Sequence, residues 1–150
     1  MKRTGFAKAD CPVARALDTI GDWWSLLIVR DAFDGLRRFG DFQKNLGIAK
    51  GMLATRLRQL VEAGVLKQVA ASDGSAYQEY LLTEKGRDLF PVVVSLRQWG
   101  EAHLYSSGEA HSVLLDQAGQ PVGQLVLPSR KGRPLAWSDT KVKKVAARRR

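Results

Sequence analysis

The stretch from Lys50 to Leu66 carries the side chains of this sequence that are best suited to contact a partner. If it is a helix with about 100° per residue, its apolar and polar side chains separate onto two arcs. The apolar arc contains Leu53, Ala54, Leu57, Leu60 and Val61. The opposite arc, called the outer face below, contains Gly51, Met52, Thr55, Arg58, Gln59 and Glu62, with Arg56 at its edge. Hydroxyl, amide and guanidinium groups on one face can exchange hydrogen bonds with a partner and neutralise an anion.

Basic residues gather around this stretch. The start of the helix, Lys50 to Met52, presents backbone N–H groups that favour a phosphate. Arg37, Arg38 and Lys44 lie shortly before it in the chain. Arg56, near the apolar edge, has two open interpretations, a contact to a phosphate or a contact to an internal acid.

The net charge of +9 is unevenly distributed along the 150 residues. Residues 35–70 carry +5 and residues 129–150 carry +8, whereas residues 71–128 carry −4 and residues 1–34 balance at zero. Positive charge concentrated around one helix and in a tail is typical of proteins that bind nucleic acid. The tail could follow DNA or could be a solubilising, unstructured end.

The elements that must position these residues follow from periodicity and from turn signals. Helices are expected at 12–20, 23–33, 39–46 and 50–63, with Gly64 in the left-handed region at the end of the last one. Strands are expected at 65–71 and 77–82 around a turn at 72–75. Thr83 should cap a long helix towards Leu104 that Pro91 bends or interrupts. Residues 37–39 could add a short extended segment, and residues 112–117 and 122–128 are expected to form a hairpin around AGQP.

Two helices joined by a turn of about four residues and followed at once by a hairpin make a winged helix-turn-helix. A helix fits the major groove of B-DNA, about 12 Å wide, where its first side chains reach the base edges. The leucine arc would therefore hold the helix on the domain and leave the outer face free to meet DNA. In this setting Arg37, Arg38 and Lys44 would flank the groove and contact the DNA backbone.

Several blocks of the sequence resemble the HxlR-type transcriptional regulators, a branch of the bacterial winged-helix proteins. They are CPVARALDTIGDWWSLLIVRD, RRFGDFQ, LATRLRQLVEAGVL and YLLTEKGRDLFPVVVSLRQWGE, which together cover about residues 8–105. The resemblance implies a homodimer that binds DNA, with an interface made by the N-terminal helix and the helix after the wing. It also places Cys11 where some members carry a thiol that senses oxidants or electrophiles.

Cys11 allows two interpretations. A thiol beside a helix N-terminus has a lowered pKa, and the thiolate is its reactive form. The alternative is a small structural residue at a helix start, and the neighbouring Asp10 opposes thiolate formation. A small-molecule or oxidant effector is therefore an open possibility.

Other classes of function have little support. The sequence contains no G-x-S-x-G, no P-loop, no G-x-G-x-x-G after a strand and no H-E-x-x-H, so we expect no enzyme, no catalytic residues, no cofactor and no metal site. A single cysteine indicates a reducing compartment. The longest apolar cluster, WWSLLIV, is too short to span a bilayer. We expect a soluble cytoplasmic protein without membrane contact.

The sequence thus predicts a mainly α-helical fold with a β-hairpin wing. The expected regions are a DNA-binding and dimerisation domain at 1–106, a β-rich extension with a hairpin at 107–137, and a basic disordered tail at 138–150. The expected function is a bacterial HxlR-type regulator, preferably a repressor, that binds double-stranded DNA as a homodimer on a palindromic operator. The alternative is a protein that coats nucleic acid without sequence preference through its basic tail.

Overall fold

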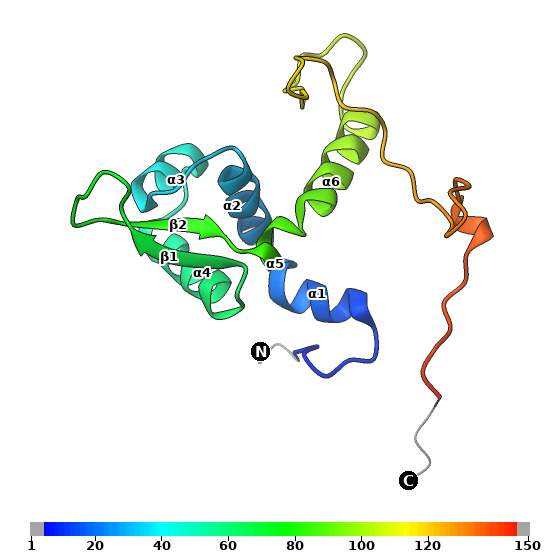
Figure 1. The fold of residues 1–150 in the computed structure, drawn as a ribbon, viewed down its shortest axis with the longest axis horizontal. Coiled ribbons are helices and arrows are strands. Elements are labelled where there is room, and N and C mark those ends of the chain that lie inside the picture. Colours follow the sequence, from blue (N-terminus) through cyan, green and yellow to red (C-terminus); the bar gives the residue numbers. More distant parts are fainter. Residues whose placement is uncertain (1–4, 147–150) are drawn as a thin grey trace. The chain divides into compact units, whose positions relative to one another are not determined.

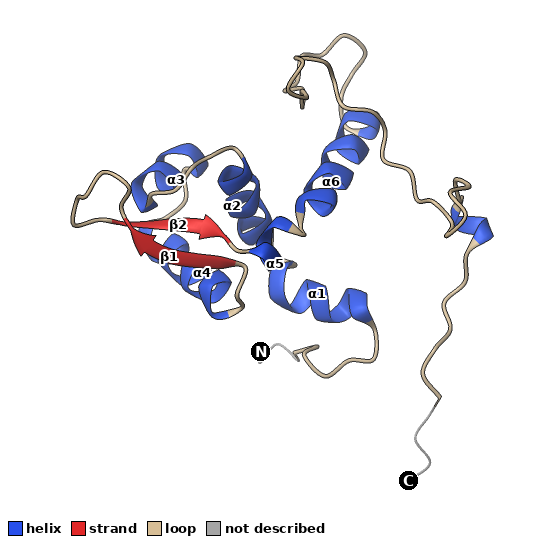
Figure 2. Ribbon diagram, in the orientation of Figure 1, coloured by secondary structure: helices blue, strands red, loops and turns tan. Residues whose placement is uncertain are grey.

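A computed structural model of the chain describes residues 5–146 (Figure 1). The chain divides into two compact units between Phe90 and Pro91. The elements of the first unit, in chain order, are α1 (Pro12–Ile20), α2 (Trp23–Phe33), α3 (Phe39–Leu46), α4 (Lys50–Glu62), β1 (Leu66–Ala70), β2 (Gln78–Leu82) and α5 (Glu84–Arg87). The helix α6 (Phe90–His103) begins at the division, and a 3-10 turn, η1 (Trp137–Asp139), follows much later. Figure 2 shows that helices predominate.

The bounds expected for the first three helices are confirmed, and local signals explain them. Pro12 occupies the first turn of α1, where a missing N–H costs nothing. The side chain of Asp22 caps α2 by accepting a hydrogen bond from the Ser25 backbone N–H at 2.9 Å. Gly47 ends α3 in the left-handed region, and Gly64 has the same conformation just after α4.

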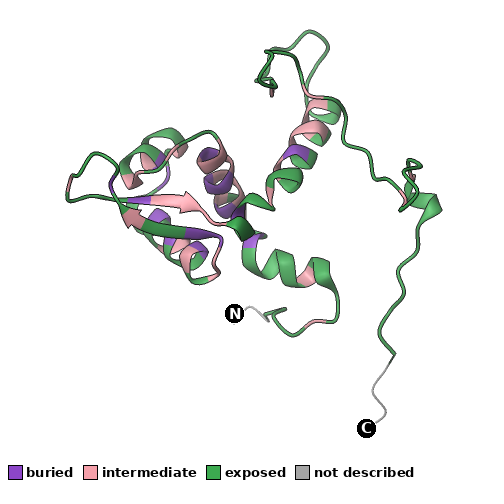
Figure 3. Cartoon of the chain, in the orientation of Figure 1, coloured by how far each residue is buried: buried purple, intermediate pink, exposed green. Residues whose placement is uncertain are grey.

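The core of the first unit forms where α2, α3 and α4 pack together behind the hairpin. Its fully buried side chains include Ile28 and Val29 from α2, Phe42 from α3, and three leucines from α4, which are Leu53, Leu57 and Leu60 (Figure 3). A buried carboxylate, Asp31, links two of these helices. It accepts hydrogen bonds from Arg30 Nη2 and from Asn45 Nδ2, both at 2.8 Å. These hydrogen bonds satisfy the buried side chain of Asp31 and connect α3 to α2.

The wing is a two-stranded antiparallel sheet whose register runs from Leu66 opposite Leu82 to Ala70 opposite Gln78. The turn between the strands includes Gly74 at positive φ. The short extended segment expected around residues 37–39 is found in part, since the backbone of Arg38 is extended, and the segment joins no sheet. It contributes one hydrogen bond, from the Tyr80 N–H to the Arg37 carbonyl at 2.7 Å, because Phe39 already begins α3.

The long helix expected after the wing is two helices, α5 and α6. Thr83 caps α5 by accepting from the Gly86 N–H at 3.1 Å. Gly86 lies so close to the backbone just before β1 that a Cβ atom there would stand 2.2 Å from the Val65 carbonyl oxygen. Pro91 is the second residue of α6, and the helical run is interrupted at Asp88 and Leu89 just before it, which is one of the two effects expected of this proline.

The hairpin expected in the C-terminal extension is wrong in its extent. A turn does form at AGQP, but a single bridge, Leu115 with Pro121, closes it, and a second turn is closed by Pro128 with Pro134. Three of these four positions are prolines, which cannot donate to a ladder, so strands do not propagate. Of the tail expected at 138–150, residues 138 and 139 belong to η1, residues 140–146 form no helix or strand, and residues 147–150 lie outside the described residues. No helix among the described residues has the length and apolarity that crossing a bilayer requires.

We predict that Leu57→Ala lowers the free energy of unfolding by about 2–5 kcal/mol, because it removes a fully buried side chain and leaves a cavity beneath α4. Urea unfolding followed by circular dichroism measures this change. Arg58→Ala on the exposed side of the same helix is the control, with an expected change within about 0.5 kcal/mol. Equal losses in the two variants would contradict the assignment of the buried face.

Candidate nucleic-acid interface

The outer face of α4 is exposed on this chain. Gly51, Met52, Arg58, Gln59 and Glu62 are exposed, whereas Leu53, Leu57 and Leu60 are buried beneath them. Thr55 is half-buried, and its hydroxyl donates to the Gly51 carbonyl at 3.0 Å. Ala54 departs from the expected arc. Its side chain is exposed, whereas Leu53, Leu57 and Leu60 are buried.

The first turn of α4 is open to an anion. Its N-cap residue, Ala49, provides no side-chain hydrogen bond to the helix, and Lys50, Gly51 and Met52 are exposed. The first N–H groups of a helix have no partner within the helix, so they are available to an acceptor from outside.

Arg56 points back towards the body of the first unit. Its Nε lies 3.3 Å from Asp22 Oδ1, and its Nη1 donates to Gln59 Oε1 at 3.0 Å. Of the two interpretations left open by the sequence, the contact with an internal acid is the one found. Asp22 is also the cap of α2, so Arg56 links α4 to the junction between α1 and α2.

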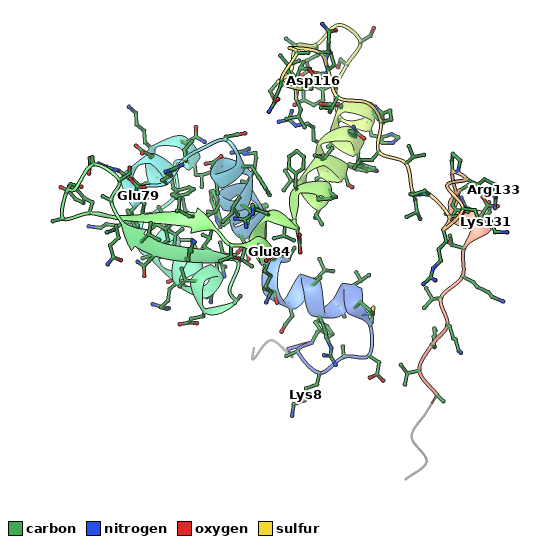
Figure 4. All side chains as sticks on the ribbon, viewed as in Figure 1. Lys8, Glu79, Glu84, Asp116, Lys131 and Arg133 are labelled. Carbon is green, nitrogen blue, oxygen red and sulfur yellow. The ribbon has the colours of Figure 1, made fainter. Side chains whose placement is uncertain are left out.

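Arg37 and Arg38 also face acids of the protein itself. Arg38 Nη2 donates to the Asp73 carboxylate in the wing turn. Arg37 Nη1 and Arg38 Nε lie 3.7 and 3.9 Å from the carboxylate of Glu79, which is nearly fully buried in β2 (Figure 4). Ser72 donates to the same carboxylate, from its hydroxyl at 2.9 Å and its backbone N–H at 3.2 Å. We call these residues, Arg37, Arg38, Ser72, Asp73 and Glu79, the wing clamp.

The wing clamp shifts the titration of its members. Hydrogen bonds from the Ser75 backbone N–H and from Arg38 hold the pKa of Asp73 well below its ordinary value. The hydroxyl and backbone N–H of Ser72 lower the pKa of Glu79, and the two arginines add to this effect. The hydrogen bond to Asp73 raises the pKa of Arg38. All three groups are therefore charged at neutral pH and hold the wing to the loop before α3.

The basic side chains on the rest of this surface differ in their pairing. Arg58 lies 3.8 Å from Glu62 one turn along α4, an exposed pair that contributes little to stability. Lys44 and Lys50 are exposed and make no ion pair within residues 5–146. Of the expected phosphate contacts, these two lysines therefore have a charge that no acid of residues 5–146 neutralises.

Cys11 lies apart from these residues in the chain. It is an exposed free thiol at the N-cap position of α1. Its carbonyl accepts the Arg15 N–H at 3.2 Å, and its side chain makes no capping hydrogen bond to the helix.

These elements define the class of the protein. Two helices joined by the turn at Gly47, with an exposed second helix and an antiparallel wing directly after it, form a winged helix-turn-helix. The chain belongs to the HxlR-like helix-turn-helix family, whose model matches residues 19–107. It is therefore a member of a family of DNA-binding transcriptional regulators.

Known relatives agree with this assignment. An uncharacterized HTH-type transcriptional regulator of Mycobacterium tuberculosis, Rv3095, is 51% identical over 92 residues, which are 61% of this chain. The match spans 58% of the length of that relative.

Two solved structures extend the comparison. The crystal structure of PA1607, a candidate transcription factor, is 56% identical with a TM-score of 0.89 and covers 93% of this chain and 99% of its own. The redox regulator HypR in its oxidized form is 35% identical with a TM-score of 0.57 and covers 62% of this chain and 97% of its own.

The acids of the wing clamp generate a prediction about pH. A carboxyl group whose pKa is lower in the folded state stabilises the fold above its unfolded pKa, and this contribution disappears as the pH falls through its folded pKa. We expect Glu79→Gln to be less stable than the wild type at pH 7 and this difference to shrink below pH about 4.3, the ordinary pKa of Glu. Urea unfolding between pH 7 and pH 3 measures both proteins.

Glu62→Gln is the matched control for this experiment, because Glu62 is exposed and only weakly paired. Its difference from the wild type should be small at every pH. A Glu79→Gln difference that stays constant down to pH 3 would contradict the ionic role assigned to Glu79.

Proposed function

We propose that this regulator acts as a homodimer on a palindromic operator, with α4 of each protomer in the major groove. The exposed outer face of α4 above a fully buried leucine face is the observation that carries this proposal. Twofold pairing would place the two helices about one helical turn of DNA apart, which sets half-sites about 10–10.5 bp apart. We expect the protein to work in the cytoplasm, where its operator is.

The side chains on this surface divide by the kind of contact that each can make. Met52, Thr55, Arg58 and Gln59 can reach base edges, since they project from the first turns of α4. Lys44, Lys50 and the N–H groups at Gly51 can hold phosphates, which position the protein without reading sequence. Arg37, Arg38 and Arg56 serve the interface indirectly, because they fix the wing and α4 through acids of the same chain.

Pairing of two protomers is supported by apolar side chains on two helices. Val13 and Leu17 of α1 are exposed, as are Leu96 and Trp99 of α6. Large apolar residues repeated along an exposed helix face commonly mark protein–protein contacts.

We propose repression as the mode of action, because a dimer that covers an operator within a promoter excludes polymerase from it.

The base-reading role of the outer face can be tested on DNA selected from random sequence by the wild-type protein. Gln59→Ala and Thr55→Ala should each reduce discrimination between the selected site and random DNA by about 1–3 kcal/mol, if each removes a good contact to a base. Fluorescence anisotropy on both DNAs measures this difference.

Gln117→Ala is the control, since Gln117 is an exposed glutamine in the C-terminal extension. It should bind both DNAs like the wild type. If Gln59→Ala and Thr55→Ala weakened binding to both DNAs equally, neither residue would read a base.

We also propose that Cys11 makes DNA binding sensitive to oxidants. The thiol is exposed at the start of α1, and the similar protein HypR is a redox regulator. Peroxide would oxidise the thiolate to a sulfenic acid and release hydroxide, which adds a polar group to a helix proposed to lie in the dimer interface.

Peroxide treatment is therefore expected to change the operator affinity of the wild-type protein and to leave that of Cys11→Ser unchanged. Mass spectrometry of the treated protein confirms the site of oxidation, and a reductant should reverse the effect. An identical response of both proteins to peroxide would exclude Cys11 as the sensor.

A further inference from the structure

Gln59 is an exposed residue of the outer face of α4, and its amide oxygen already has a partner. Arg56 Nη1, three residues earlier on the same helix, donates to Gln59 Oε1 at 3.0 Å. The amide nitrogen, Nε2, makes no hydrogen bond within residues 5–146. Gln59 therefore has an occupied acceptor and an available donor.

The chemistry of Arg56 decides which end of this amide it binds. A guanidinium group has five N–H donors and no acceptor, so it can bind only the oxygen of a neighbouring amide. If the amide of Gln59 turned by 180°, its NH₂ group would face the N–H groups of Arg56, with no acceptor on either side. The position of Arg56 therefore determines the orientation of the amide.

Arg56 is itself held by the carboxylate of Asp22. The Nε atom of Arg56 is buried and has no hydrogen-bond acceptor among the described residues, and Asp22 Oδ1 lies 3.3 Å from it. Only 25% of the Arg56 side chain and 20% of the Asp22 side chain are exposed. Salt screens an ion pair of this kind less than one that is fully exposed, so the attraction keeps Arg56 close to Asp22.

Asp22 is fixed from its other side by the start of α2. Its Oδ1 accepts from the Ser25 N–H at 2.9 Å, its Oδ2 accepts from the Ser25 hydroxyl at 2.6 Å, and Ser25 is buried. The turn just before Asp22 is tight, because a Cβ atom at Gly21 would stand 2.2 Å from the Leu17 carbonyl oxygen. Four side chains of the first unit are thus connected in series, from a buried hydroxyl to an exposed amide: Ser25, Asp22, Arg56 and Gln59.

The orientation of the amide limits the base that Gln59 can read. A glutamine commonly binds adenine through two hydrogen bonds, one donated to N7 and one accepted from the N6 amino group. That contact requires the oxygen and the nitrogen of the amide to face the base together, whereas Oε1 of Gln59 faces Arg56. Guanine presents two adjacent acceptors in the major groove, O6 and N7, which match the two N–H groups of Nε2.

We propose that Arg56 and Asp22 orient the amide of Gln59 so that only its N–H groups meet the DNA, and that Gln59 therefore selects a guanine in each half-site. This inference rests on the proposed function, since it requires α4 to lie in the major groove. Arg56 and Asp22 are positioning residues in this account, because they act on the DNA through Gln59.

The test measures base preference at every position of the DNA sites that the wild-type protein selects from random sequence. Gln59→Ala identifies the position that Gln59 contacts, because preference should be lost there and kept elsewhere. The wild type should prefer G·C at this position. In Arg56→Met the amide is free to turn and to bind adenine, so the preference for guanine over adenine should fall at least about fivefold at this position.

Asp22→Asn is a second variant that tests the same arrangement. Asparagine still caps a helix, but it has no charge to hold Arg56. The preference should therefore change at the same position and in the same direction as in Arg56→Met, and circular dichroism shows whether each variant is folded. A purely structural role of the two residues would instead weaken binding to all sequences without changing the preference at one position.

Arg58→Met is the matched control. It removes a guanidinium group from the same helix, but Arg58 is paired with Glu62 and makes no hydrogen bond to Gln59 within residues 5–146. The preference for guanine over adenine at the position of Gln59 should stay as in the wild type.

Three results would overturn the inference and leave the homodimer on a palindromic operator intact. They are a palindromic site in which Gln59→Ala changes no single position, a preferred base pair other than G·C at the position of Gln59, and a preference for guanine that both Arg56→Met and Asp22→Asn leave unchanged. If the wild type selected no palindromic site, the inference and the proposed function would fail together.

Discussion

The structure depends on the burial of one side of α4. Leu53, Leu57 and Leu60 are almost completely removed from water between α2, α3 and the wing. Each such side chain contributes about 1.5–3 kcal/mol relative to exposure, so the helix cannot rotate without losing much of the stability of a small domain. The outer face is therefore presented in one fixed orientation. Its polar side chains need no partner within the domain and can be selected for contact with DNA.

Two sets of ion pairs help to hold α4 and the wing in this arrangement. The wing clamp ties the hairpin to the loop before α3, and the pair of Arg56 with Asp22 ties α4 to the start of α2. Arg37, Arg38 and Arg56 thus form ion pairs within the protein. Their positive charge also raises the electrostatic potential of the surface. The exposed Lys44 and Lys50 make no ion pair within residues 5–146, and a lysine ammonium can meet a phosphate without the fixed geometry that a guanidinium requires.

Much of the first unit could be predicted because its signals are local. Pro12, Asp22, Gly47 and Gly64 mark helix ends through backbone and capping preferences that do not depend on the rest of the fold. The roles of Arg37 and Arg38 could not be predicted in this way, since Asp73 lies 35 residues after Arg38 and Glu79 lies 42 residues after Arg37. The acids Asp73 and Glu79 can be seen in the sequence, but only the structure shows that they face the arginines. The absence of a regular hairpin after α6 could also have been predicted locally, because Pro121, Pro128 and Pro134 cannot donate hydrogen bonds to a sheet.

The contact between Arg56 and Asp22 has a consequence for attempts to transplant operator preference between relatives. Grafting only residues 50–62 onto a scaffold without a carboxylate at position 22 would leave Arg56, and the Gln59 amide that it contacts, without the anchor that Asp22 provides. The residues that would have to be transferred together thus extend beyond α4. Position 22, distant in the chain, should covary with position 56 across the family, and a chimera should retain its donor's preference only when both are exchanged.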